Sequence, residues 1–119
     1  MTFHSKPTVV FDFDGVVHSY KSGWCGPKNI PDEPVEGIRE AIADIREHYR
    51  VVIVSTRCDY EGGVAAIWDW LYEHNIIVDD VRKEKPPAIV YIDDRAICFN
   101  GKPHTLLDQI KTFEPWYKT

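Results

Sequence analysis

The stretch TVVFDFDG, residues 8–15, joins an apolar run rich in β-branched and aromatic residues to two aspartates and a glycine. Two further apolar runs follow it, VVIVS at residues 51–55 and AIVYI at residues 88–92. Uninterrupted apolar runs of this length are typical of strands that are buried on both faces of a parallel sheet. We therefore expect three central strands, the first of them at residues 8–13.

Helical spacing follows the first of these runs. From Val35 to Tyr49, apolar residues recur at steps of three and four. This spacing predicts a helix over about residues 34–49, with Asp32 as its cap and Pro34 in its first turn.

The second half of the chain repeats the alternation. Residues 64–74 carry another helical pattern, residues 76–78 could form a minor strand, and a last helix is expected around residues 106–113, where Pro115 stops it. Strands that alternate with helices predict an α/β fold. We expect a Rossmann-like, doubly wound, mostly parallel sheet in a single domain spanning residues 1–119.

Residues 15–33, which we call the flap loop, contain several glycines and prolines and show no sustained period. Loops of this length are uncommon in a small domain unless they are functional, and this one leaves the end of the first strand, where open α/β sheets bind ligands. We expect it to form part of an active site. Its polar and aromatic side chains either contact a substrate or cover the core; they are His18, Ser19, Tyr20, Lys21 and Trp24. In contrast, Trp68, Trp70 and Trp116 are predicted to be packing residues.

Composition narrows the class of protein. The 119 residues include 14 basic and 19 acidic side chains, and the net charge of -5 provides no basic surface for a nucleic-acid backbone. No apolar run is long enough for a membrane helix, and residues 1–7 lack the apolar core of a signal peptide, so we expect a cytoplasmic protein that does not bind membranes. The three cysteines are widely spaced, which predicts free thiols.

Polar residues end each of the three apolar runs. Parallel strands would bring these residues to one edge of the sheet; they are Asp12 and Asp14, then Ser55, Thr56 and Arg57, then Asp93 and Asp94. Carboxylates crowded together either share a proton or bind a cation. A hard cation with oxygen ligands is the simpler answer, and we expect Mg²⁺.

Four motifs, in the order VVFDFDGVV, VVIVSTR, a lysine before the last strand, and VYIDDRA, resemble the haloacid dehalogenase superfamily of phosphohydrolases. The resemblance covers Val9 to Ala96. It implies that Asp12 is a nucleophile that becomes an aspartyl phosphate, and that Asp14 is the general acid and base, with a backbone carbonyl that reaches the metal.

The resemblance also implies roles for the later motifs. Ser55 would hydrogen-bond the transferring phosphoryl group, and Asp94 would bind the metal, with Asp93 as a second ligand or an outer partner. Lys85 fits the family spacing better than Lys83 and would offset the negative charge of nucleophile and phosphate.

Four further residues complete the predicted phosphate-binding set: Gly15, Val16, Thr56 and Arg57. A guanidinium at Arg57 could clamp a phosphate through two parallel hydrogen bonds. The SxR and DDR combination also resembles the phosphatase half of polynucleotide kinase-phosphatases, which suggests the 3′-phosphate of nucleotides or nucleic-acid ends as an alternative substrate. The acidic net charge does not favour a nucleic acid.

The family's relatives often carry a cap domain that closes the site, and this chain has no room for one. An open site would admit a large or extended phosphorylated substrate, unless a second subunit of a homo-oligomer covers it. The rival function is a noncatalytic module that binds metal or phosphate. Asp14 favours an enzyme, because a module without turnover has little need of a group that protonates a leaving oxygen. A phosphoacceptor receiver domain is disfavoured, since it would need an aspartate where Ser55 stands.

Overall fold

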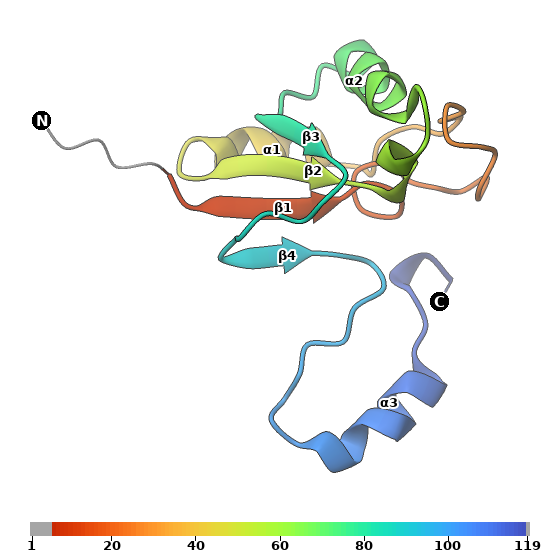
Figure 1. Cartoon of the computed structure of the whole chain (residues 1–119), viewed down its shortest axis with the longest axis vertical. Coiled ribbons are helices and arrows are strands. Elements are labelled where there is room, and N and C mark those ends of the chain that lie inside the picture. Colours follow the sequence, from red (N-terminus) through yellow and green to blue (C-terminus); the bar gives the residue numbers. More distant parts are fainter. Residues whose placement is uncertain (1–5, 119) are drawn as a thin grey trace, which may run out of the picture.

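Four parallel strands form one sheet in the computed structural model, which describes residues 6–118 (Figure 1). The strand order is β3-β2-β1-β4, and each neighbouring pair is parallel. The bounds are β1 (Thr8–Asp12), β2 (Arg50–Val54), β3 (Asp80–Arg82) and β4 (Val90–Ile92). The predicted α/β class, with its parallel sheet in a single domain, is confirmed.

Two helices cover one face of the sheet. They are α1 (Ile38–Arg46) and α2 (Gly63–Glu73). The core joins Ile42 of α1 and Ile67 of α2 to alternate strand residues such as Phe11 and Ile53. The side chains between them, such as Val52, point to the other face, where the partly buried Ala88 of the link between β3 and β4 packs against them. Both faces of the central strands are therefore apolar, as the uninterrupted runs require.

The first predicted helix is too long at both ends. It begins at Ile38 because Gly37 has a left-handed backbone (φ 82°) and the N–H of Val35 donates to the carbonyl of Val17. These contacts tie residues 34–37 to the flap loop instead of to a helix. Asp32 is not a helix cap, since its carboxylate accepts hydrogen bonds from Ser22.

The predicted minor strand at residues 76–78 is also wrong. Ile76 and Val78 are buried in the core, but the chain joins the sheet only at β3. Asp79 positions the chain beside β2 directly before β3. Its N–H donates to the Val51 carbonyl, and its carboxylate accepts from the Val51 N–H and from Arg46. The second predicted helix is confirmed as α2.

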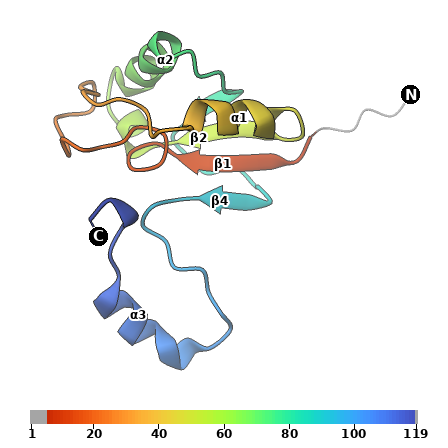
Figure 2. The ribbon, with the colours of Figure 1, turned by 180° about the vertical axis from the view of Figure 1, so that it is seen from behind.

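The last helix, α3 (Leu106–Thr112), lies away from the sheet, beyond β4 (Figures 1 and 2). Leu107 and Ile110 on this helix are each 62% exposed. Three short 3₁₀ helices complete the described elements: η1 (Thr56–Asp59), η2 (Pro103–Thr105) and η3 (Trp116–Lys118). Within residues 6–118, the helices lack the length and apolar character that crossing a membrane demands.

Candidate active site

The carboxyl ends of the strands meet around one cavity of about 470 Å³. Because β1 pairs directly with β4, the residues that end these strands lie side by side. Most of the predicted site residues line the cavity: Asp12, Asp14, Ser55, Thr56, Lys85, Asp93 and Asp94. Lys83, the alternative to Lys85, lines it too. The strand ends thus bring together side chains that are up to about 80 positions apart in the chain.

Three carboxylates form the centre of this site, and we call them the carboxylate triad: Asp12, Asp93 and Asp94. One oxygen from each lies within 4.8 Å of the other two. Burial, a hydrogen bond with Asp94 and the charge of Asp93 raise the pKa of Asp12 to about 8. A set of carboxylate oxygens at this spacing fits a hard divalent cation such as Mg²⁺, which would relieve the repulsion between them.

The two lysines have different neighbours. The Lys85 ammonium nitrogen lies 3.9 Å from a carboxylate oxygen of Asp93, next to the triad. The Lys83 nitrogen lies 3.8 Å from a carboxylate oxygen of Asp59, on the cavity wall. Lys85 is therefore the lysine that can offset charge at the triad.

Gly15 makes room for the triad. Its φ of +82° is a left-handed conformation, and a Cβ atom placed on it would lie 2.3 Å from Oδ2 of Asp94. Contacts this short do not occur with real Cβ atoms. Gly15 is therefore needed both for the turn after β1 and for the approach of Asp94.

We expect Gly15→Ala to weaken Mg²⁺ binding at least about tenfold, because the methyl group must push Asp94 out of the triad. Calorimetric titration with Mg²⁺ measures this change. Gly23→Ala is the matched control, since Gly23 has a similar φ of +70° but a Cβ added there would meet no atom within 4 Å. Equal losses of Mg²⁺ affinity in both variants would show that backbone strain, and not displacement of Asp94, is responsible.

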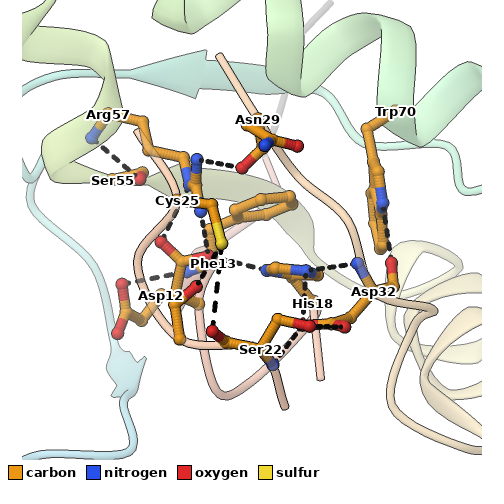
Figure 3. A network of polar contacts seen from close by, with 12 residues as sticks. Asp12, Phe13, His18, Ser22, Cys25, Asn29, Asp32, Ser55, Arg57 and Trp70 are labelled. Atoms are coloured by element: carbon orange, nitrogen blue, oxygen red, sulfur yellow. Dashed lines mark hydrogen bonds and ion pairs between the residues drawn. The ribbon is translucent and has the colours of Figure 1, made fainter. Parts of the chain in front are cut away.

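Asp14 is held by two buried side chains. Arg57 Nε and Nη2 donate to the two carboxylate oxygens of Asp14 at 2.9 and 3.0 Å, and Nδ1 of His18 lies 2.8 Å from Oδ1. The N–H of Asp32 donates to Nε2 of His18, so the proton of a neutral ring is on Nδ1 and is donated to Asp14 (Figure 3). Burial raises the pKa of Asp14, but the hydrogen bonds from His18 and Arg57 outweigh it and lower the pKa below its usual value.

Arg57 does not have the position of a phosphate clamp. Its side chain is fully buried, and Nη1 donates to the carbonyls of Gly26, Pro27 and Asn29 at 2.8 to 3.1 Å (Figure 3). Because its other donors go to Asp14, the guanidinium fastens the flap loop to the end of β1. The prediction that Arg57 binds phosphate is therefore wrong for this structure.

Gly15 and Val16 also fall outside the cavity lining of the described residues. The N–H of Gly15 donates to the His18 carbonyl, the N–H of Val16 donates to the Phe13 carbonyl, and the Val16 side chain packs against the core. Their amides are committed to the turn and not to a phosphate. Ser55 caps η1, since its hydroxyl accepts from the Arg57 N–H. It also lines the cavity, so its predicted contact with a phosphoryl group stays a prediction.

The flap loop divides into covering and lining residues. His18 and Ser19 are buried, whereas Tyr20 and Trp24 line the cavity. The chain's C-terminal segment supplies a wall that the sequence did not indicate, because Tyr117 also lines the cavity. Trp116 is 55% exposed, so its prediction as a packing residue is wrong; its indole N–H donates to the Gly15 carbonyl at 2.7 Å.

The remaining tryptophan predictions divide in the same way. Trp70 is 4% exposed and packs in the core, whereas Trp68 is 38% exposed. The indole N–H of Trp70 donates to the Asp32 carbonyl, so this core residue also supports the flap loop (Figure 3).

No family model, curated protein or solved structure matches the chain.

Proposed function

We propose that the protein is a magnesium-dependent phosphatase of the haloacid dehalogenase type, which hydrolyses a phosphomonoester through an aspartyl phosphate on Asp12. The observation that carries the proposal is the carboxylate triad, with three oxygens within 4.8 Å and a lysine beside it. This arrangement supplies oxygen ligands for a cation together with a carboxylate that can attack phosphorus.

The strand order supports the assignment. The order β3-β2-β1-β4 agrees with the first strands of a Rossmann-like, doubly wound sheet, and β1 and β4 flank the point where the order reverses. Ligands of such sheets bind at this point, outside the carboxyl ends of the strands. The triad lies there, because Asp12 ends β1 and the other two aspartates follow β4.

In the first step, a carboxylate oxygen of Asp12 would attack phosphorus, and the bond from phosphorus to the leaving oxygen would break. Asp14 would give its proton to that leaving oxygen. In the second step Asp14 would take a proton from a water molecule, whose oxygen attacks phosphorus and releases the Asp12 carboxylate. Lys85 would offset the negative charge during both steps, and Mg²⁺, when bound by the triad, would stabilise charge on the phosphoryl oxygens.

Asp14 suits the second step as the structure stands, since its lowered pKa keeps it ionised at neutral pH. The first step requires the protonated form. An approaching phosphate dianion would raise the pKa of Asp14, because a nearby like charge disfavours the carboxylate. His18 and Arg57 hold the side chain in place through this change of protonation.

The test is phosphate release from a set of small phosphomonoesters, with Mg²⁺ and after its removal by a chelator. We expect turnover that requires Mg²⁺ and returns when Mg²⁺ is restored. Binding of Mg²⁺ without release of phosphate from any compound would support the rival function, a noncatalytic module that binds metal or phosphate.

Mg²⁺ affinity should rise with pH between about 6 and 8 and then level off, because the cation must displace the proton that Asp12 holds below its raised pKa. The expected slope is about tenfold per pH unit for one displaced proton. Calorimetry in buffers of different ionisation enthalpy measures both the affinity and the released proton. In Asp12→Asn the remaining affinity should not change over this range, and a wild-type affinity that is equal at both ends of it would contradict the assignment of Asp12 as a ligand.

A further inference from the structure

Aromatic side chains from three separate segments line the cavity around the carboxylate triad. Tyr20 and Trp24 come from the flap loop, Tyr91 from β4, and Tyr117 from η3. The proposed phosphoryl transfer uses none of these rings, since it needs only charged and hydrogen-bonding groups. Aromatic side chains offer flat apolar surfaces, which can stack on a planar ring that the ligand carries in addition to its phosphate group.

Tyr20 has a backbone conformation that such a residue rarely adopts. Its φ is 62°, in the left-handed region, where a bulky side chain is strained. The ring meets the edge of the Tyr117 ring with the centroids 6.3 Å apart, and both rings line the cavity. Strain that is kept at a residue facing a cavity is typical of a ligand-binding position.

Trp24 is 48% exposed but fixed in place. The guanidinium carbon of Arg57 lies 4.8 Å from the centre of its ring, and the ring of Tyr60 lies beside it at 6.2 Å between centroids. Arg57 is itself fully buried and hydrogen-bonded to the flap loop. The exposed indole is therefore held ready on the cavity wall, which lowers the entropy lost when it binds a ring.

Tyr117 is also held, although it lies at the far end of the chain. The bond from the Trp116 indole to the Gly15 carbonyl anchors the preceding residue. The Tyr117 hydroxyl lies 3.5 Å from a guanidinium nitrogen of Arg95. Rings from both ends of the chain are thus fixed next to the triad.

We propose that the cavity binds a phosphomonoester whose leaving group carries a planar aromatic ring, with the size of a nucleoside monophosphate. This inference rests on the proposed phosphatase function and names its substrate class. A cavity of about 470 Å³ is suited to a small molecule. Five acidic side chains line it against three basic ones, which disfavours the polyanionic backbone of a nucleic acid.

The test compares adenosine 5′-monophosphate with ribose 5-phosphate, which has the phosphate and the sugar but no planar aromatic base. We expect kcat/KM to be at least about tenfold higher for the nucleotide, within the range that stacking of one base provides. Calorimetry with Asp12→Asn in the presence of Mg²⁺ should show the same preference in Kd. Trp24→Leu should reduce the preference, taken as the ratio of the two kcat/KM values within that variant, to threefold or less.

Trp68→Leu is the matched control, because Trp68 is 38% exposed on α2 and the described lining of the cavity does not include it. This variant should keep the full preference. Equal kcat/KM and equal Kd for the two compounds would overturn the inference and leave the phosphatase proposal standing. A preference for the nucleotide that stays at its full size in Trp24→Leu would also overturn the inference.

Two other outcomes are decisive. If neither compound releases phosphate but Asp12→Asn still binds the nucleotide at least tenfold more tightly, the phosphatase proposal fails and the ring site is supported. If a 3′-phosphorylated oligonucleotide is a tenfold better substrate than the mononucleotide, the small-molecule assignment is overturned in favour of a nucleic-acid end.

Discussion

Asp12→Asn should abolish phosphate release while leaving the protein folded. The amide has the shape of the carboxylate but cannot form the aspartyl phosphate, and loss of a nucleophile lowers turnover by about 10⁴-fold or more. The fold should not suffer, because burial and the neighbouring carboxylates already make an ionised Asp12 unfavourable. Because the pKa of Asp12 is raised to about 8 in the folded state, the free energy of unfolding falls as the pH rises from the unfolded-state pKa to that value. The variant should therefore unfold at a higher temperature than the wild type in Mg²⁺-free buffer at pH 8. The difference in unfolding temperature should be smaller at pH 5.

Steady-state phosphate release and thermal unfolding, measured on the same preparations, test both parts. Asp59→Asn is the matched control: it removes a carboxylate from the cavity wall, where Asp59 pairs with Lys83 outside the triad. That variant should keep turnover within about threefold, as expected for an exposed ion pair. Turnover by Asp12→Asn above a tenth of the wild-type rate would contradict a nucleophilic role.

Arg57→Met should be the most destabilising single change near the site. It removes the guanidinium donors that bond the Asp14 carboxylate and three flap-loop carbonyls, and it leaves a partly buried carboxylate without its cation. Breaking a buried pair by removing one partner costs about 3–5 kcal/mol. Urea unfolding should show this loss as a lower midpoint with little change in slope.

A double variant separates the ion pair from the packing. Asp14→Asn in the Arg57→Met background should recover part of the loss, because the uncompensated charge is gone. Arg39→Met is the control for removing an arginine, since Arg39 is exposed and pairs only with Glu40 among the described ion pairs; its urea midpoint should stay close to that of the wild type. A midpoint for Arg57→Met that equals that of Arg39→Met would contradict the role of Arg57 as a structural fastener.

The centre of the site could be predicted from sequence because it depends on two local properties. The first two apolar runs form buried strands as predicted, whereas the third forms the edge strand β4, in which Val90 and Tyr91 are exposed. The residue that ends each strand is nevertheless fixed by the chain itself. Asp12 and Asp94 therefore lie where the pattern puts them. Lys85, which the resemblance favoured over Lys83, lies next to the triad as well.

Arg57 shows what such reasoning misses. A guanidinium binds a carboxylate and a phosphate with the same geometry, so residue type alone does not distinguish a fastener from a clamp. Burial by the carbonyls of Gly26 and Asn29 decides it, and these come from a loop with no periodic pattern. Tyr117 is missed because it contacts the turn at Gly15, about 100 residues earlier, and no local pattern in the sequence indicates a contact over that separation.

The start of α1 shows tertiary contacts that override local preference. Pro34 suits the first turn of a helix, but it lies in an isolated bridge to His18. The left-handed Gly37 then sets the true start. The pattern of apolar residues therefore locates the helix and fails only at its ends; at the start, the backbone hydrogen bond from Val35 to Val17 of the flap loop decides.

The direct pairing of β1 with β4 has a consequence for the order of folding. The unit of β1, α1 and β2 can form from neighbouring segments, whereas β4 must close a loop of about 80 residues before it reaches β1. That late step also brings two more carboxylates against Asp12, so it is opposed by charge as well as by entropy. A divalent cation would therefore stabilise the late pairing of β4 with β1 and not the earlier formation of the β1, α1 and β2 unit. The rate of unfolding should then respond to Mg²⁺ more than the rate of folding.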